Sequence, residues 1–371
     1  MKMITPRTIS IIGAGPVGCY AGYLLAKAGH QVTIYENHPQ VGCPIQCTGL
    51  LTSEFDEFQL PMDSFLVNTF QGVEVFSPKR KLEVKQKEYL VCRTKFDNFF
   101  ADLARKAGAE IFVNHSFVRK ESKELIIKDS AHNCEKRITP DIVLAADGPL
   151  SPTAKAYGMY HPERENYFGV QAVVKGNFDP TKFQAYFGRE VCPDLFGWIV
   201  PESTTIARVG IAMKKNSKAY FDKFMQEHNF KAIEMQAGTI PLYHPVQELQ
   251  KENCYVLGDA AGFVKATTLG GLYPGLKQVQ ILAECLIAGK ERDYKKAIAP
   301  LRRRLRLHLF VQKIFNKFSD EDWDRLVEYI AQPRIQRVFE KYTRDNPIPL
   351  VLNSLLKEPR LLRFGKYLFV K

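Results

Sequence analysis

The sequence contains no run of about 18 consecutive apolar residues, the length that a membrane-spanning helix requires. The opening segment MKMITPRT is too short, ahead of the first apolar stretch, to be a signal peptide. The eight cysteines lack the paired spacing of metal-binding fingers, and we expect a chain without a signal to keep them reduced. These absences argue against an integral membrane protein and a disulfide-linked secreted protein, and they predict a cytoplasmic location and no metal site.

Acidic residues are too few to balance the basic ones, because the 371 residues include 52 Lys and Arg but only 40 Asp and Glu, a net charge of +12. Residues 291–371 hold 19 basic and 10 acidic residues, whereas the first 290 residues hold 33 and 30. A basic segment of this kind suits nucleic acid or an anionic membrane surface. No nucleic-acid recognition motif accompanies the charge, so we expect no nucleic-acid partner and consider a membrane surface instead.

What the sequence does contain is a glycine-rich fingerprint in residues 9–36, ISIIGAGPVGCYAGYLLAKAGHQVTIYE. This pattern is typical of a strand, a tight turn, a helix and a second strand. Gly13 turns the chain, Gly15 lets a pyrophosphate approach the backbone, and Gly18 allows the helix to pack closely on the strand. The start of the helix then offers free backbone N–H groups to the phosphates.

Glu36 ends the second strand, where a carboxylate accepts hydrogen bonds from an adenosine ribose and repels a 2′-phosphate. The segment therefore suits FAD or NAD better than NADP. Because this acid, both strands and the helix accompany the glycines, a glycine-rich turn in some other α/β protein is the weaker interpretation.

Two later apolar strands end beside an acidic residue and a glycine. The first delivers Asp147 and Gly148, and the second delivers Gly258 and Asp259. Ligands of open α/β folds bind at the carboxyl edge of the sheet, so these carboxylates can hydrogen-bond ribityl or ribose hydroxyls. A plain β-turn is the alternative for Asp147-Gly148.

The segment after Asp259 is a second glycine-rich turn followed by a helix that runs to Cys285. We expect this helix to begin near Gly270 and Gly271. Its N-terminus carries partial positive charge and can point at the pyrimidine edge of a flavin. Two segments far apart in the sequence would then serve one ligand.

The loop after the second strand, NHPQVGCPIQCTGLL, carries the thiols of Cys43 and Cys47. In a flavin-binding domain this stretch can fold back over the isoalloxazine ring, so both are candidates for the flavin neighbourhood. A redox disulfide, a metal pair and two ordinary buried thiols are the alternatives. Arg93, at the start of an amphipathic helix over 96–107, can reach a cofactor phosphate or remain solvated.

Alternating apolar and polar residues predict a β-hairpin over residues 70–91 and further strands between 167 and 241. The alternation favours an antiparallel sheet with one apolar face. Aromatic side chains on these strands either line a cavity or belong to the core. The candidates are Phe183, Tyr186, Phe187, Phe196 and Trp198.

Three segments together resemble the FAD-contacting motifs of the p-hydroxybenzoate-hydroxylase-type flavoproteins: residues 13–36, 147–148 and 258–262. Within that superfamily, VGCPIQCTGLL resembles the Pro-x-x-Cys loop of the geranylgeranyl reductase family. Arg93 with TKFDNFFADLARKAGAE resembles its Arg-x-x-Phe-Asp helix, and LFGWIVPES resembles its Tyr-x-Trp-x-Phe-Pro signature. Phe196 and Val200 depart from that signature. In KATTLGGLYPG, only the adjacent pair Gly270 and Gly271 stands where the family has a proline before a triple-glycine turn.

The resemblance implies an α/β fold. It comprises a Rossmann-like FAD-binding domain on a parallel sheet, an inserted antiparallel β-sheet that binds substrate, and a helical basic C-terminal segment. The implied segments are 1–65, 92–160 and 240–299 for the FAD-binding domain, 66–91 and 161–239 for the substrate-binding sheet, and 300–371 for the helical segment.

The resemblance also implies the activity, which is FAD-dependent reduction of carbon–carbon double bonds in a polyprenyl (geranylgeranyl) chain of an isoprenoid lipid or prenyl diphosphate. Cys47 would lie near the reacting alkene, and Phe187, Phe196 and Trp198 would line the substrate tunnel. The implied FAD contacts are Gly13, Gly15, Gly18, Glu36, Arg93, Asp147, Gly148, Gly258, Asp259, Gly270 and Gly271. An aromatic or alkene monooxygenase and a quinone-linked flavoprotein are alternatives on the same framework, and an FAD-stabilised scaffolding protein is a third.

No second dinucleotide fingerprint is present, so NAD(P)H and a ferredoxin both remain candidate electron donors. The C-terminal RLLRFGKYLFVK mixes bulky apolar and basic residues, as an interfacial element does, and predicts peripheral attachment to the cytosolic membrane face. An apolar helical stripe further upstream is explained equally by packing on the core. Its members are Leu307, Phe310, Val311, Ile314 and Phe318.

Overall fold

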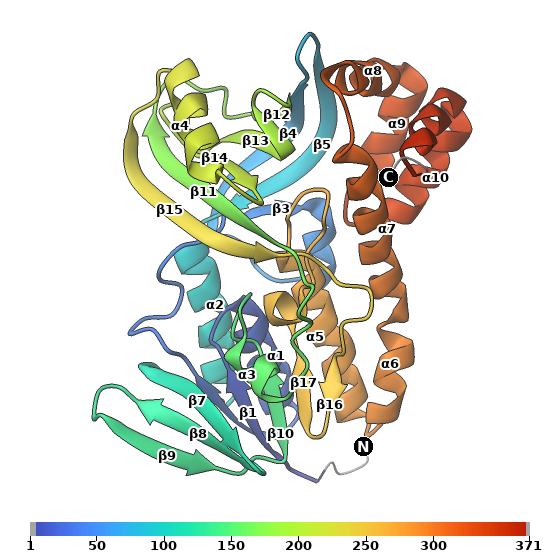
Figure 1. Cartoon of the computed structure of the whole chain (residues 1–371). Coiled ribbons are helices and arrows are strands. Elements are labelled where there is room, and N and C mark those ends of the chain that lie inside the picture. The colour runs from blue at the N-terminus through green and yellow to red at the C-terminus, as the bar shows by residue number, and fades with distance from the viewer. Residues whose placement is uncertain (1–4, 369–371) are drawn as a thin grey trace.

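The computed structural model describes residues 5–368, which form two large sheets at opposite ends of the molecule and a column of helices along one side (Figure 1). The six-stranded sheet has the order β16-β17-β10-β1-β2-β6. Its neighbours are parallel except for the short β16–β17 pair. Its strands are β1 (Thr8–Ile12), β2 (Gln31–Tyr35), β6 (Glu110–Phe112), β10 (Ile142–Ala145), β16 (Gln250–Lys251) and β17 (Cys254–Val256).

The glycine fingerprint forms β1, α1 (Pro16–Lys27) and β2, as predicted. The isoleucines of β1 are buried because both faces of a parallel sheet are covered. The helix begins at a proline, whose fixed φ suits a first helical turn. At Gly22 a Cβ would lie 2.7 Å from Cδ1 of Ile34 in β2, so this close helix–strand contact requires glycine.

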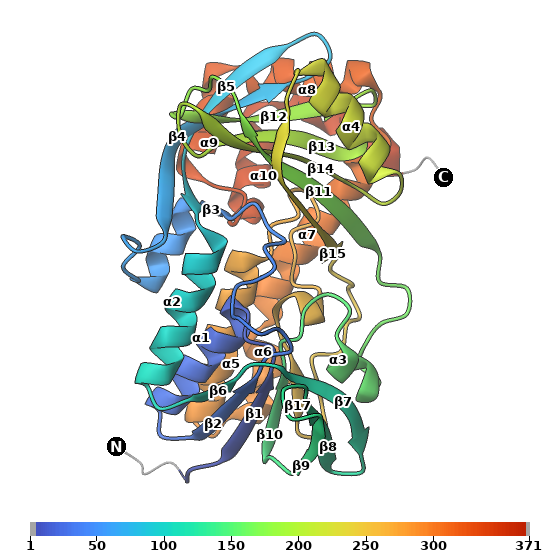
Figure 2. The same cartoon turned by 90° about the vertical axis from the view of Figure 1, so that its left-hand side faces the viewer.

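Helices and a small sheet cover the six-stranded sheet. On one face α1 packs between α2 (Arg93–Lys106) and α5 (Leu272–Ile287). A three-stranded antiparallel sheet lies beside β2 and the short helix α3 (Pro152–Ala156), at the lower end of the molecule in Figures 1 and 2. Its strands are β7 (His115–Glu121), β8 (Glu124–Asp129) and β9 (Cys134–Ile138).

The eight-stranded sheet has the order β15-β11-β14-β13-β12-β4-β5-β3 and carries α4 (Ser217–Glu227) on its outer face. It is antiparallel as predicted, with one exception, because β12 pairs in parallel with β4. The exception arises because the β4–β5 hairpin and the later β11–β15 strands enter the sheet from different parts of the chain. The strands are β3 (Leu50–Thr52), β4 (Leu66–Phe76), β5 (Lys81–Val91), β11 (Asn166–Lys175), β12 (Lys182–Gly188), β13 (Cys192–Pro201), β14 (Ile206–Met213) and β15 (Ala232–Pro241).

The C-terminal segment is helical, and α7 runs along the side of the molecule from the lower sheet to the upper one (Figure 1). Its buried positions are Leu301, Leu305, His308 and Gln312, whereas Phe310 is 46% exposed. The buried stripe therefore differs from the predicted one in part. Phe318 is buried as predicted, but the helix also buries His308 and Gln312, whose side chains find hydrogen-bond partners in the interior. The helices are α6 (Tyr294–Ala297), α7 (Ala299–Phe315), α8 (Asp320–Ile330), α9 (Pro333–Lys341) and α10 (Pro347–Lys357), followed by the 3-10 segment η4 (Pro359–Leu368).

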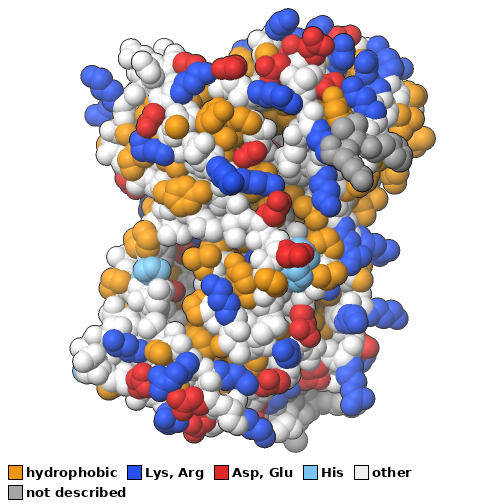
Figure 3. Space-filling view, viewed as in Figure 1, with side chains coloured by type: hydrophobic (Ala, Val, Ile, Leu, Met, Phe, Trp, Pro, Cys, Tyr) orange, Lys and Arg blue, Asp and Glu red, His pale blue; other side chains and the backbone are white. Residues whose placement is uncertain are grey.

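The molecule narrows at mid-height, between the two large sheets (Figure 3). Basic side chains are frequent along the side that the C-terminal helices occupy in Figure 1. Among residues 5–368, no helix has the length and apolar character needed to cross a bilayer.

Candidate active site

A cavity of about 670 Å³ lies between the six-stranded and eight-stranded sheets. One end, called here the cofactor end, is lined by Gly13–Val17, Glu36, Asp147 and Asp259. The other, called the apolar end, is lined by Val73, Val75, Phe183, Ala185, Phe187, Leu195, Phe196, Trp198 and Val200. A single cavity thus joins a polar surface built on the ends of parallel strands to an apolar surface built on the upper sheet.

The glycines of the first turn have separate structural roles. Gly13 has a φ of 101°, and a Cβ there would lie 2.4 Å from the carbonyl oxygen of Ala146. Gly18 does not line the cavity, but a Cβ on it would lie 2.0 Å from the carbonyl oxygen of Gly13. Gly15 faces the cavity, and a Cβ on it would have no neighbouring atom within 4 Å, so this position leaves open space for a ligand.

Glu36 is held rigidly at the edge of the cofactor end. Its side chain is almost fully buried, and Oε2 accepts a hydrogen bond from the backbone N–H of Ala14 at 2.8 Å. Oε1 accepts the backbone N–H of His38 at 2.9 Å and lies 2.6 Å from Nδ1 of the same residue. The carboxylate is therefore fixed against the glycine turn, where an adenosine ribose would need it.

Two further carboxyl groups reach the cavity from the ends of β10 and β17. Asp147 accepts hydrogen bonds from Oγ of Ser151 at 2.5 Å and from the backbone N–H of Thr153 at 2.9 Å. Burial raises its pKa, and these hydrogen bonds act in the opposite direction. Burial likewise raises the pKa of Asp259, against the charges of Arg93 and Arg164. Both groups are desolvated acceptors positioned to receive ligand hydroxyls.

The second glycine-rich turn brings the start of α5 to the same place. Gly271 is the N-cap of α5, and a Cβ on it would lie 2.8 Å from Oδ1 of Asp259. Gly258 has a φ of 57° and packs against Val17 outside the cavity lining. Leu269 lines the cavity with a φ of 54°, a left-handed conformation that glycine usually adopts.

Cys47 and Arg93 lie side by side at the wall of the cavity. The Arg93 guanidinium makes a two-point ion pair with Asp97, at 3.1 and 3.0 Å, instead of remaining solvated. Burial alone would lower the pKa of Arg93, but the Asp97 carboxylate and the Cys47 thiol outweigh it and hold that pKa above its usual value. Cys43 and Cys47 are both free thiols in this structure.

The side chains that line the apolar end are set by the two-residue period of the strands, because alternate residues face the cavity. Phe183, Ala185 and Phe187 of β12 line the cavity, whereas Tyr186 points to the opposite face of the sheet. There Tyr186 stacks on Phe76 with ring centroids 4.5 Å apart. The inclusion of Tyr186 among the cavity candidates was therefore wrong, since alternation places it outside the cavity.

A chain of polar side chains crosses the cavity wall, and the sequence did not indicate it. Oε1 of Gln171 accepts hydrogen bonds from Oγ1 of Thr48 at 2.6 Å and from Nε1 of Trp198 at 3.0 Å. Nε2 of Gln171 donates to Oε1 of Gln236 at 2.7 Å. The network links Thr48, the residue next to Cys47, through Gln171 to Trp198 in the wall of the apolar end.

Buried ion pairs connect the cavity to the loop between α9 and α10, and sequence patterns gave no signal for them. Nζ of Lys265 lies 2.5 Å from Oδ1 of Asp345, and Arg344 pairs with Glu88. Lys265 and Arg344 both line the cavity. Burial opposes ionisation of Asp345, but the charges of Lys265 and Arg344 keep its pKa below the usual value.

The structure brings most of the predicted site residues into one cavity lining. These are Gly13, Gly15, Glu36, Cys47, Arg93, Asp147, Gly148, Asp259, Gly270, Gly271, Phe187, Phe196 and Trp198. Gly18 and Gly258 lie outside it and act through packing.

Comparisons with known proteins agree with this geometry. Residues 11–62 match the model of the NAD(P)-binding Rossmann-like domain family. The digeranylgeranylglycerophospholipid reductase of Methanocaldococcus jannaschii is 28% identical, over 96% of this chain and 97% of its own. Digeranylgeranylglycerophospholipid reductase 2 of Methanothermobacter thermautotrophicus is 26% identical, over 86% of this chain and 90% of its own.

A solved structure of a geranylgeranyl bacteriochlorophyll reductase-like protein from Thermoplasma acidophilum superposes with a TM-score of 0.83 at 21% identity, covering 96% of this chain and 98% of that one. The p-nitrophenol 4-monooxygenase of Pseudomonas putida has a TM-score of 0.64 at 18% identity, covering 98% and 99%. The overall fold is thus shared with both reductase-like and monooxygenase proteins.

The residues of the cofactor end fit FAD. The open space at Gly15, the fixed Glu36 carboxylate and the Asp147 and Asp259 carboxyls match the pyrophosphate and hydroxyl groups of a dinucleotide, and the start of α5 faces the same cavity. These features are those of an FAD-dependent oxidoreductase, and the chain is similar over most of its length to digeranylgeranylglycerophospholipid reductases.

Proposed function

We propose that this protein reduces carbon–carbon double bonds in geranylgeranyl chains carried by a glycerophospholipid or a prenyl diphosphate. The observation that carries the proposal is the single cavity that connects a dinucleotide site to an aromatic and aliphatic pocket. The names of the relatives point to the same class of substrate. We assign substrate binding to the upper sheet, residues 66–91 and 161–239, and FAD binding to residues 1–65, 92–160 and 240–299.

In this proposal the cofactor end holds FAD by its backbone N–H groups and carboxylates. Glu36 binds the ribose, while Asp147 and Asp259 bind hydroxyl groups further along the cofactor. Gly270 and Gly271 allow the start of α5 to approach the flavin ring. When bound and reduced, FAD supplies a hydride for one carbon of the alkene.

The apolar end contributes by excluding water from the alkene. Phe187, Phe196 and Trp198 line it with ring surface, which favours an extended isoprenoid chain through the hydrophobic effect. An isolated alkene has no carbonyl group to stabilise developing charge, so the second carbon needs a positioned proton donor.

We assign that proton to the thiol of Cys47. The sulfur accepts the backbone N–H of Gly49 at 3.4 Å, which orients the side chain, and the neighbouring Arg93 is itself fixed by Asp97. Cys47→Ala should retain FAD and lose alkene reduction, and Cys47→Ser should retain part of the activity. Cys43→Ala is the matched control, because Cys43 lines the same cavity but is given no role. A fully active Cys47→Ala variant would remove the thiol from the mechanism.

The experiment that tests the function is anaerobic incubation of the FAD-bound protein with dithionite and geranylgeranylated lipid, followed by mass spectrometry of the lipid. Each reduced bond adds one H₂. NADH, NADPH and a reduced ferredoxin are then compared as donors. Oxygen uptake with a hydroxylated product in air, and no hydrogenation without air, would place the protein among the monooxygenases instead.

We further propose that α10 and η4 attach the protein to an anionic membrane surface. Ile348, Leu352 and Leu356 follow one another at four-residue spacing on α10, and Leu356 is 80% exposed. Leu362 and Leu368 of η4 are exposed as well. The only acidic residue between 347 and 368, Glu358, is buried against Arg334 and Arg360. Basic residues border the leucines as in interfacial helices. They are Lys357, Arg360, Arg363 and Lys366.

Flotation with phosphatidylglycerol vesicles tests this attachment. Wild type should float with anionic vesicles and less with phosphatidylcholine vesicles, because part of the attraction is electrostatic. Leu352→Gln/Leu356→Gln should lower the vesicle partition coefficient by roughly 100-fold or more, since burying the two leucines contributes about 3 kcal/mol. Ile233→Gln on β15 is the control, because Ile233 is also exposed but lies far along the chain from α10. Equal flotation of all variants would contradict the proposal.

A further inference from the structure

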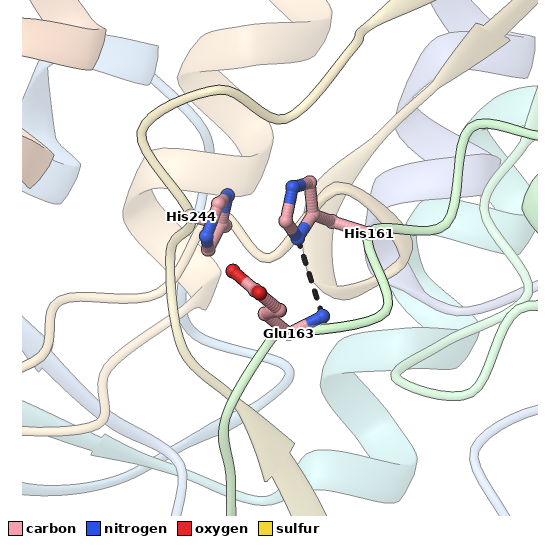
Figure 4. Close-up of side chains that lie close together, drawn as sticks. All are labelled: His161, Glu163 and His244. Carbon is pink, nitrogen blue, oxygen red and sulfur yellow. Dashed lines mark hydrogen bonds between the residues drawn. The ribbon is translucent and has the colours of Figure 1, made fainter.

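A second cluster of polar side chains lies outside the cavity, on the two connections between the sheets. His161 and Glu163 belong to the loop that leads from α3 to β11, and His244 belongs to the loop that returns from β15 to β16. Figure 4 shows the three side chains converging from these two loops. The cluster therefore bridges the outgoing and the returning chain.

The geometry of the cluster is close to that of a metal site. One nitrogen of each histidine and one carboxylate oxygen of Glu163 all lie within 4.8 Å of one another. The two imidazole rings are stacked, with centroids 3.6 Å apart and planes 20° from parallel. Among residues 5–368 no other group of three such side chains meets this spacing.

The donor atoms are largely uncommitted. Nδ1 of His244 is buried and has no hydrogen-bond partner among the described residues. Nδ1 of His161 accepts only the backbone N–H of Glu163, at 3.3 Å (Figure 4). A buried nitrogen without a partner has lost its hydrogen bonds to water and forms none within the protein. A ligand bound to this nitrogen would therefore stabilise the folded state.

The surroundings of His244 favour the neutral form of its imidazole. Burial is the largest cause that lowers the pKa of His244, and the neighbouring His161 adds to it. Arg164 and Lys313 also lower this pKa, whereas Glu163 raises it. His244 is therefore neutral at neutral pH, as a metal ligand must be. Arg164 does not occupy the cluster, because its guanidinium donates to the carbonyl oxygens of Pro149 and Ala260.

We propose that His161, Glu163 and His244 bind one Zn²⁺ ion, with water in the fourth position. Two imidazoles and one carboxylate are a donor set that zinc accepts in tetrahedral geometry, whereas Mg²⁺ and Ca²⁺ prefer oxygen donors alone. Zinc–nitrogen bonds of about 2.0–2.1 Å place tetrahedral ligands about 3.4 Å apart. Metal binding therefore requires the donor atoms to approach by up to about 1.4 Å and the two rings to turn out of their stack.

The bound ion would tie together the two connections between the FAD-binding sheet and the upper sheet. Its effect is on the coupling of the sheets, and it takes no part in the reaction. This inference does not depend on the proposed substrate, and it fails or holds separately from it.

Zinc titration of the full FAD-bound chain, freed of metal with EDTA, tests the site by calorimetry. Wild type should bind one more equivalent of Zn²⁺ than His161→Ala/His244→Ala. Glu163→Gln, which keeps both histidines and disturbs the fold least, should weaken binding by roughly 10-fold or more. His132→Ala is the matched control, because its side chain is 79% exposed in the turn after β8. Zinc should also raise the thermal midpoint of wild type and leave that of the double variant unchanged.

Zinc uptake by cysteine thiols is distinguished by the same comparison, because thiol binding would persist in the histidine variants. Co²⁺ provides a second readout. Wild type should show tetrahedral d–d absorption to the red of the flavin band without a thiolate charge-transfer band, and the double variant should lose it. Equal zinc stoichiometry and affinity in wild type and the double variant, or no zinc binding by wild type, would overturn the inference.

Discussion

The two ends of the cavity are built by opposite means. The cofactor end consists of backbone and short acidic side chains, and its shape depends on glycines whose missing Cβ atoms leave space or permit contact. The apolar end consists of large side chains that alternate along strands of the upper sheet. We therefore expect a single added methyl group to abolish or greatly weaken cofactor binding at the cofactor end. At the apolar end, we expect substrate binding to change gradually with side-chain volume.

The largest effect should follow from methyl groups at Gly18 and Gly15. Gly18→Ala forces a Cβ to 2.0 Å from the carbonyl oxygen of Gly13, so we expect loss of FAD and of native stability. Gly15→Ala meets no atom within 4 Å, so we expect a folded protein whose FAD affinity falls roughly 100-fold because the methyl group occupies the pyrophosphate's approach. Urea unfolding and FAD fluorescence titration measure the two effects separately.

Gly365→Ala is the control for both, because Gly365 has open space around it and lies far from the cavity in η4. Normal FAD affinity in Gly15→Ala would contradict the assignment of this position to the cofactor.

The next largest effect concerns the ion pair beside the second glycine turn. Lys265→Met leaves the Asp345 carboxylate buried without its partner, and we expect a loss of about 3–5 kcal/mol in the free energy of unfolding. Lys265→Met/Asp345→Leu removes both charges and should recover most of that loss. Urea unfolding measures both, and a double variant no more stable than the single one would show that the pair does not act as a unit.

His308 should give the stability a pH dependence. Its Nε2 donates to the Arg344 carbonyl oxygen and its Nδ1 accepts from Thr267, so both nitrogens are satisfied in the neutral form. Burial, aided by Lys265, lowers its pKa to about 4 from 6.5. The unfolded chain therefore binds one more proton between these values, and stability should fall by about 1.4 kcal/mol per unit as pH drops from about 6.5 toward about 4.

His308→Gln can replace both hydrogen bonds without titrating. Between about pH 4 and 6.5, the slope of its unfolding free energy against pH should therefore be smaller than that of wild type by the contribution of one proton. All other residues are the same in both proteins, so the difference between the two pH profiles isolates His308. Parallel pH profiles for wild type and His308→Gln would contradict this account.

The smallest effect should come from the apolar end. Phe196→Ala removes ring surface from the cavity wall, and we expect KM for a geranylgeranyl substrate to rise roughly 10- to 30-fold, from a loss of about 2 kcal/mol, with kcat little changed. Tyr186→Leu is the control on the opposite face of β12 and should leave KM unchanged. Equal effects of the two substitutions would remove the distinction between the faces of the sheet.

The difference between the two ends also explains what the sequence could predict. The cofactor motifs lie within short stretches, where strand, turn and helix are specified by neighbouring residues, so Gly13 and Glu36 could be identified from the sequence, and both line the cavity. The apolar end depends on register between distant strands, and that register decides that Phe187 faces the cavity while Tyr186 does not. The pairs Lys265–Asp345 and Arg344–Glu88 join residues far apart in sequence, and no local pattern identifies such contacts.

The strand orders of the two sheets bear on how the protein emerges from a ribosome. The six-stranded sheet begins with β1 near the N-terminus but needs β17, and the eight-stranded sheet needs both β4 and β15. Neither sheet is complete until most of the chain has been synthesised. The Lys265–Asp345 ion pair can form only after residue 345 of 371 has been added. Such non-local pairing slows folding and leaves strand edges uncovered during synthesis. Early translation products of this chain should therefore depend on chaperones more than a protein whose domains are completed one after the other.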